Sequence, residues 1–155
     1  MADITDEAVF ERASAEHTEL LVQLMREFYD FEHLPWDGAA ARSALGMALD
    51  DPALSEVWLI RRSGEAAGYF VLGFGFSLEF RGRFALLDEL YLREPFRGGG
   101  LGRRAIRHAE EVCRARGIEA LRLEVEHKNA GAQAFYRAVG FEGHERYLLT
   151  RWIPG

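Results

Sequence analysis

A glycine-rich loop is the feature of this sequence that most directly predicts chemistry. Residues 97–102 are Arg-Gly-Gly-Gly-Leu-Gly, and they lie between an apolar, strand-like run and an amphipathic helical pattern. Glycine adopts positive φ and lets the backbone approach a ligand, so successive N–H groups can converge on an anion. The next helix adds the positive end of its dipole, and Arg97 can add a charge-assisted contact. The loop therefore predicts a phosphate-binding site.

Two common phosphate-binding patterns fit this loop poorly. A P-loop needs Lys and Ser or Thr after its last glycine, whereas Gly102 is followed by two arginines. A dinucleotide motif fits as Gly100-x-Gly102-x-x-Ala105, with Glu124 about twenty residues further on. In that fold, however, the strand leads straight into the glycines, whereas residues 93–97 intervene here and little chain follows. An NAD-linked oxidoreductase is therefore a distant alternative.

Segments on both sides of the loop support a third interpretation. They are a strand pattern at 86–92, a Pro95-Phe96 turn, a second strand pattern at 121–126, and the run Asn129-x-x-Ala132-x-x-Phe135-Tyr136-x-x-x-Gly140-Phe141. With Arg97-x-x-Gly100-x-Gly102, these segments resemble the GNAT N-acetyltransferase superfamily in its acetyl-CoA motif and its second signature. The resemblance extends over residues 57–152, and the order of two motifs around a strand makes it specific.

The resemblance implies an enzyme that moves an acetyl group from acetyl-CoA to a primary amine by direct attack in a ternary complex. The expected acceptor is a small cationic metabolite or antibiotic, and a homodimer is implied as well. A protein lysine or N-terminal acetyltransferase is one alternative. A domain that binds acyl-CoA without turnover, as a sensor, is another.

The cofactor is expected between two parallel strands, at 84–92 and 120–126, which splay apart in the resembling family. Unpaired backbone groups near Leu90 and Leu92 would then bond the pantetheine arm like an added strand. The expected cofactor-binding residues are Leu90, Tyr91, Leu92, Arg97, Gly98, Gly99, Gly100, Leu101, Gly102, Arg103, Asn129, Ala132 and Tyr136. No metal is expected, because the histidines show no metal-ligand spacing.

Transfer to an amine needs a base, because an amine with a pKa near 10.4 is neutral in roughly one molecule in 2,500 at pH 7. Asp88 and Glu89 are the candidates, and a regular strand would turn only one of them toward the cleft. Glu89 is favoured, although family members often have a bulge here that upsets the alternation. Either carboxylate could instead pair with an arginine. The resemblance assigns Tyr136 as the proton donor to the leaving thiolate, the alternative being a packed core tyrosine.

Acceptor contacts are expected in the loop between the first two helices, where the resembling family builds a variable acceptor site. His33 and Trp36 lie in this loop, and Glu79 at a strand end and Asp88 are the other candidates. The structural alternative for Glu79 is an ordinary strand end.

The elements that must position these residues form one α/β (α+β) domain over residues 1–155. We expect a mixed, mostly antiparallel sheet of about six strands, flanked by four helices. The expected strands are 8–13, 57–62, 67–79, 84–92, 120–126 and 144–152, and the expected helices are 14–29, 37–49, 101–116 and 130–139.

Composition is consistent with a compact cytoplasmic protein. The 155 residues are 48% hydrophobic, and the formal net charge of −6 argues against nucleic acid and mildly favours cationic substrates. No apolar run is as long as a membrane span, and the first three residues, Met-Ala-Asp, are unlike a signal peptide. Cys113, the single cysteine, excludes an internal disulfide.

Overall fold

A computed structural model describes residues 7–155, which fall into two compact units that divide after Glu124. The first three residues, which the sequence predicts to be unlike a signal peptide, lie outside the described part of the chain. Within that part, no helix is both long and apolar enough to cross a membrane.

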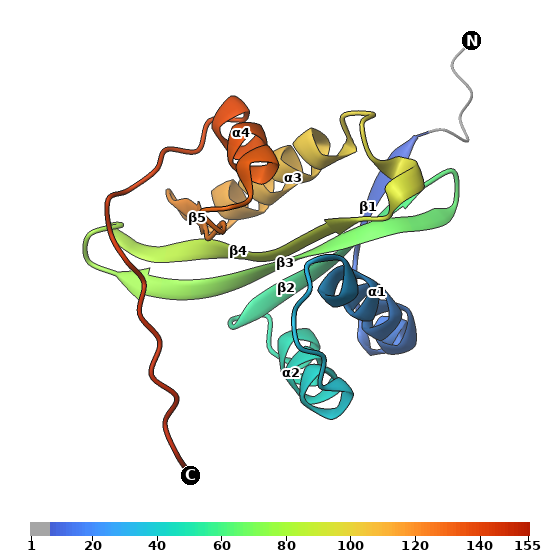
Figure 1. The fold of residues 1–155 in the computed structure, drawn as a ribbon, viewed down its shortest axis with the longest axis horizontal. Coiled ribbons are helices and arrows are strands. Elements are labelled where there is room, and N and C mark those ends of the chain that lie inside the picture. The colour runs from blue at the N-terminus through green and yellow to red at the C-terminus, as the bar shows by residue number, and fades with distance from the viewer. Residues whose placement is uncertain (1–6) are drawn as a thin grey trace. The chain divides into compact units, whose positions relative to one another are not determined.

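The first unit is built on a five-stranded sheet in which each strand pairs with its neighbours in sequence (Figure 1). The first four strands pair antiparallel and the last pair is parallel, so the predicted mixed, mostly antiparallel sheet is confirmed. The strands are β1 (Ala8–Arg12), β2 (Ser55–Arg62), β3 (Glu65–Ser77), β4 (Gly82–Leu92) and β5 (Leu121–Leu123).

The parallel pair of β4 and β5 is short. Its ladder joins Ala85–Leu87 to Leu121–Leu123 and then stops, while β4 continues to Leu92. The second half of β4 therefore has no ladder partner on this side among the described residues, as a splayed pair requires.

Helices cover both faces of this sheet. Figure 1 shows α1 (Thr18–Phe31) and α2 (Gly38–Asp50) on one face and α3 (Leu101–Ala115) on the other. In α1 the buried residues Leu21, Leu24 and Met25 recur at helical spacing, as one apolar face of a helix requires. Asp37 caps α2, because its Oδ1 accepts a hydrogen bond from the backbone N–H of Ala40 at 3.1 Å.

An ion pair ties α1 to the end of β4. Arg93 donates from Nε and Nη2 to the two carboxylate oxygens of Glu27, at 3.0 and 2.8 Å. Such a two-pronged contact fixes direction as well as distance. It holds the last turns of α1 beside the strand that carries Asp88 and Glu89.

The second unit, residues 125–155, contains α4 (Ala130–Ala138). Asn129 caps this helix through a 3.1 Å bond from the Ala132 N–H to its Oδ1, and the chain turns at Gly140 with φ +106°. The strand expected at 144–152 is wrong, since residues 141–155 form no strand. A strand depends on pairing with a neighbour, and no ladder of the described residues includes this segment. The described sheet therefore has five strands rather than about six.

Candidate active site

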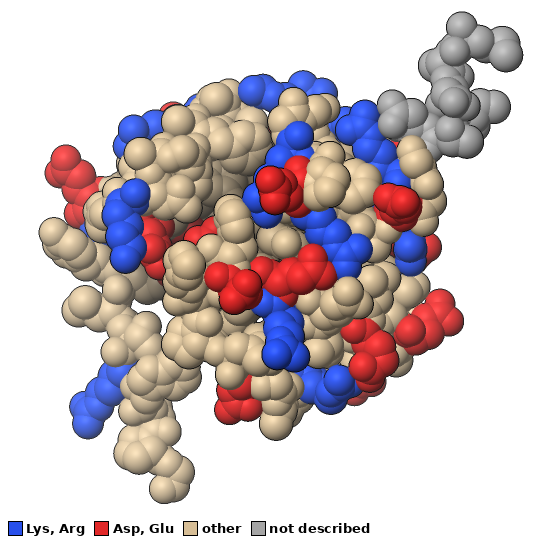
Figure 2. Space-filling model, turned by 45° about the vertical axis from the view of Figure 1, so that its right-hand side comes forward, with Lys and Arg blue, Asp and Glu red and all other residues tan. Residues whose placement is uncertain are grey.

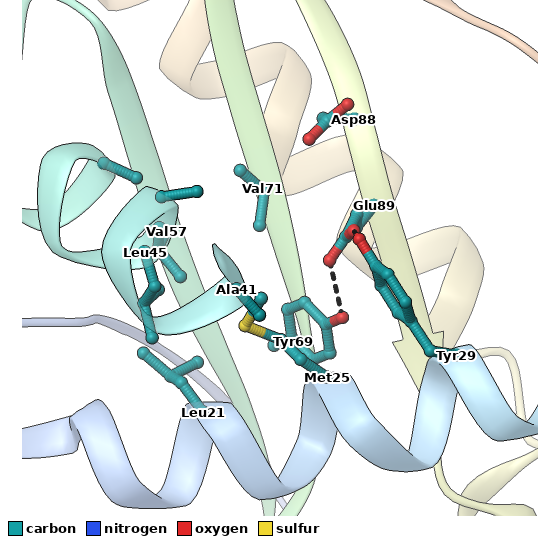
Figure 3. A pocket seen from close by; sticks show the side chains of 12 residues that line it. Leu21, Met25, Tyr29, Ala41, Leu45, Val57, Tyr69, Val71, Asp88 and Glu89 are labelled. Atoms are coloured by element: carbon teal, nitrogen blue, oxygen red, sulfur yellow. Dashed lines mark hydrogen bonds between the residues drawn. The ribbon is translucent and has the colours of Figure 1, made fainter. Parts of the chain in front are cut away.

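A β-bulge in β4 brings two carboxylates to the same side of the sheet. Val71 of β3 lies opposite Glu89, whereas the next residue, Leu72, lies opposite Leu87. Asp88 is thus the extra residue, and a bulge of this kind re-aims the side chains around it. Asp88 and Glu89 line one cavity between the sheet and the helices α1 and α2 (Figure 3). Regular alternation would have turned only one of them to this face.

Two tyrosines hold the carboxylate of Glu89. The hydroxyl of Tyr29 on α1 donates to Oε2, and that of Tyr69 on β3 donates to Oε1, each at 2.7 Å. The Tyr69 ring is fully buried, and the Tyr29 ring packs edge-on against Trp36 at 5.4 Å. Glu89 is therefore fixed from two elements and cannot turn away without breaking both bonds.

Burial raises the pKa of Glu89 above its ordinary value; the nearby charge of Asp88 acts in the same direction, while the two tyrosine bonds oppose the shift. Burial and the charge of Glu89 raise the pKa of both Tyr29 and Tyr69, so both hydroxyls stay protonated donors. A carboxylate of raised pKa in a fixed position is a stronger base than one in water.

Asp88 differs from Glu89 in its surroundings. Its side chain is open to solvent, and no residue in the described part of the chain donates a hydrogen bond to its carboxylate. Nearby protein atoms still displace enough water to raise the pKa of Asp88. Neither Asp88 nor Glu89 forms the considered ion pair with an arginine of residues 7–155. The cavity thus has one tethered and one accessible acid.

The glycine loop joins β4 to α3 through a 3-10 turn, Glu94–Phe96. Gly98 and Gly100 both have φ of +81°, a backbone conformation that side chains disfavour. Gly100 is the N-cap residue of α3, and Leu101, which is only 1% exposed, anchors the first turn. Positive φ at two of three consecutive glycines is the conformation expected of an anion-binding loop.

Two arginine side chains lie near this loop, one next to the glycines and the other against α1. A Cβ on Gly99 would lie 3.1 Å from Nη1 of Arg62, which comes from the end of β2. The guanidinium of Arg97 is 4.2 Å above the ring of Phe31, and its Nε donates to the carbonyl of Leu92 at 2.8 Å. The predicted Arg97 therefore lies against α1, whereas Arg62, which the sequence did not single out, lies next to the glycines.

The backbone of Leu90 and Leu92 faces away from β3. Arg93 N–H bonds the Ala67 carbonyl across the ladder at 2.8 Å, and bonded residues alternate along an antiparallel pair. The N–H and C=O groups of Leu90 and Leu92 therefore point to the side where β5 no longer pairs. Tyr91 is turned instead into the core cluster on the α1 side.

The remaining predicted acceptor residues are dispersed. Trp36 touches the site through Tyr29, but neither it nor His33 lines the cavity. His33 follows α1 with φ +56°. Glu79 lies in the turn between β3 and β4, roughly 20 Å along the hairpin from Glu89, at about 3.3 Å per strand residue. The structure therefore does not bring Glu79 to the carboxylate pair.

In the second unit, Tyr136 lies on α4, next to the ring of Phe135 at 5.2 Å and edge-on to Phe141 at 5.7 Å. Asn129 and Ala132 lie together at the start of this helix through the cap bond. Within this unit, Asn129 caps the helix and Tyr136 packs against neighbouring aromatic rings.

Charges of both signs are interspersed on the face that Figure 2 shows, with no single sign dominating it. The excess of acidic residues is therefore not gathered into one extended field on this face. Among the described residues, no group of three His, Cys, Asp or Glu side chains could hold a metal ion.

Comparison with known proteins identifies the family. The model of the Acetyltransferase (GNAT) family matches residues 18–141, so the chain belongs to that family of acetyltransferase enzymes. An integron cassette protein from the mobile metagenome of the Cole Harbour salt marsh has a similar structure, with a TM-score of 0.83 and 32% identity over 94% of this chain and 91% of that one.

Curated relatives carry N-acetyltransferase names. An aminoalkylphosphonate N-acetyltransferase of Salmonella typhimurium is 28% identical over 94% of this chain and 92% of that protein. A thialysine N-epsilon-acetyltransferase of Bos taurus is 34% identical, over 53% of this chain and 51% of that protein. The matched part spans about half of this second relative.

Proposed function

We propose that the protein transfers an acetyl group from acetyl-CoA to the primary amine of a small cationic molecule. The observation that carries this proposal is the bulge in β4, which places Asp88 and Glu89 on one cavity a few residues before the glycine loop. Family membership supports acetyl transfer, and the relatives named for aminoalkylphosphonate and thialysine support a small amine as acceptor.

Acetyl-CoA would bind along the second half of β4. The backbone groups of Leu90 and the N–H of Leu92 would bond the pantetheine arm, while the Leu92 carbonyl already accepts from Arg97. The amides of the glycine loop and the first turn of α3 would bond the diphosphate. Arg62 next to Gly99 supports a charged contact there. Arg103 in the first turn and Asn129, Ala132 and Tyr136 remain the predicted contacts of the sequence motifs.

Glu89 would act as the base and Asp88 as the group that attracts the cationic amine. The raised pKa of Glu89 and its two tyrosine bonds suit it to take one proton from the bound ammonium group, directly or through a water, so that a neutral amine nitrogen attacks the thioester carbonyl. The carbon–sulfur bond then breaks, and the leaving thiolate takes a proton from Tyr136 to give the CoA thiol. The second proton lost from the nitrogen restores the Tyr136 hydroxyl through water. The products are the N-acetylated amine and CoA.

Thiol release from acetyl-CoA tests the proposal across alkylamines, polyamines, amino acids, aminoglycosides and lysine peptides. We expect release with a small amine, and a loss of at least tenfold in kcat for Glu89→Gln, within the range of general base catalysis. Glu111→Gln, an exposed glutamate of α3, is the matched control and should keep full activity. Acetyl-CoA binding without release from any of these amines would refute the transferase function and favour a sensor.

Three broader properties accompany this proposal. We propose that the two units form one domain, which a single cooperative unfolding transition would support. We propose a homodimer, which light scattering after size exclusion tests. A cytoplasmic location completes the proposal and is tested by cell fractionation.

A further inference from the structure

The cavity at the carboxylate pair has two chemically different ends. Its volume is about 140 Å³. Figure 3 shows Tyr29, Tyr69, Asp88 and Glu89 at one side and the aliphatic side chains of Leu21, Leu45 and Val57 at the other. The aliphatic end offers no hydrogen-bond partner to a ligand.

Alanines of α2 make room for this cavity. Ala41, Ala44 and Ala48 line it together with Leu45 at helical spacing, so most of the side chains that α2 contributes to the cavity are methyl groups. Leu45 beside them is buried, and the helix is otherwise packed against β2. The cavity is thus closed by buried residues at Leu45 and opens toward Ala44, which is exposed.

We propose that this cavity binds the apolar body of the acceptor and that its amine meets Asp88 and Glu89. This inference rests on the proposed function and narrows its substrate class to a primary monoamine on a short alkyl or phenylalkyl group. An apolar cavity of about 150 Å³ is large enough to hold benzene, so the space fits a phenyl ring or an alkyl chain of similar bulk.

A second positive charge on the acceptor would be disfavoured. At the far end it would lie against Leu21, Leu45 and Val57 without a partner, and an unpaired charge in an apolar site costs several kcal/mol. A polyhydroxylated body would meet the same difficulty, because its hydroxyls would lose water without finding new partners.

The wild-type enzyme tests this with an amine series from ethylamine to pentylamine, phenethylamine and 1,4-diaminobutane, measured by thiol release. We expect kcat/KM to rise about fourfold for each methylene that the cavity buries. Pentylamine and 1,4-diaminobutane have the same number of heavy atoms, and we expect the monoamine to be favoured at least tenfold. Equal rates along the series, or preference for the diamine, would overturn the inference and leave the transferase function intact.

A matched pair of variants locates the binding space. Ala40 and Ala44 are both exposed positions of α2, and only Ala44 lines the cavity. Ala44→Leu would add bulk at the edge of the cavity, whereas Ala40→Leu adds the same bulk away from it. We expect Ala44→Leu to lower kcat/KM for pentylamine at least tenfold, to change that for ethylamine little, and to leave the KM for acetyl-CoA unchanged. Ala40→Leu should change none of these, and equal effects of the two variants would overturn the inference.

Calorimetry separates this inference from the proposed function. If no amine releases thiol, binding of pentylamine in the presence of CoA still tests whether the cavity binds the apolar body of an amine. Binding that Ala44→Leu abolishes and Ala40→Leu preserves would support the cavity while refuting the transferase function. Absence of pentylamine binding would refute the cavity as the binding site of the acceptor.

Discussion

Replacing Tyr69 by phenylalanine should raise the pKa of Glu89 and move the pH dependence of the enzyme. The Tyr69 hydroxyl donates to Oε1 of Glu89 at 2.7 Å from a ring with 0% exposure, so water does not readily replace it. A hydrogen bond to a charged group contributes about 1.5–3 kcal/mol, and one pKa unit corresponds to about 1.36 kcal/mol. The acidic limb of kcat/KM should therefore move up by about one to two pH units.

A pH profile of kcat/KM distinguishes this effect from a general loss of structure. Tyr69→Phe should be slow below the shifted limb and recover above it, because the base is then ionised again. Tyr29→Phe, whose ring is partly exposed, should shift the limb less, and Tyr91→Phe, whose hydroxyl faces Glu27 at 3.5 Å, should not shift it. An unmoved limb in folded Tyr69→Phe would refute the assignment of Glu89 as the tethered base.

Tyr69→Phe should also change how the free energy of unfolding depends on pH. Burial already raises the pKa of Glu89 in the folded protein. At pH values between the unfolded and the folded pKa, the folded protein therefore keeps a proton on Glu89 that the unfolded chain has lost. Stability therefore falls as pH rises from the unfolded pKa, near 4.5, through the folded one, and Tyr69→Phe should deepen this fall. Urea unfolding at pH 4.5 and pH 8 measures the difference.

Other predictions concern the scaffold and the second unit. Gly68→Ala should destabilise the fold by about 1–3 kcal/mol or more in urea unfolding, because the new Cβ would lie 1.9 Å from the Tyr91 carbonyl oxygen; Gly73→Ala on the same strand has no atom within 4 Å and should cost less. Burial lowers the pKa of His108, so acid should destabilise the protein as pH falls below about 6.5, and His108→Phe should flatten this dependence in thermal melts. Tyr136→Phe should lower turnover at least tenfold with little change in acetyl-CoA affinity, and unchanged turnover would exclude it as the proton donor.

Features set by neighbouring residues were predictable from the sequence. The glycine loop and the start of α3 follow from local backbone preferences, and the Asp37 cap of α2 follows from the type of residue that precedes a helical pattern. The strand expected at 144–152 failed because an apolar, strand-like composition does not by itself provide a pairing partner.

Contacts between distant residues were not predictable in this way. Tyr29 and Tyr69 lie 60 and 20 residues before Glu89, and each looks like an ordinary amphipathic aromatic in its own element. Arg62 ends a strand far from the loop that it approaches. Arg97 illustrates the reverse case, since its motif predicts a phosphate contact while Phe31, from α1, supplies its partner in the structure.

The bulge at Asp88 shows why the two carboxylates could not be assigned from alternation. Cross-strand partners share a face, so Glu89 lies with Val71 on the cavity side while Leu87 lies with Leu72 on the other. Leu87 and Glu89 are two residues apart and would face the same side of a regular strand. The extra residue allows Leu87 to stay buried while Glu89 reaches its tyrosines. Deleting Asp88 would leave Leu87 and Glu89 adjacent, and a regular strand would still turn them to opposite faces, so the effect of the bulge is to add the accessible acid to the cavity beside the tethered one.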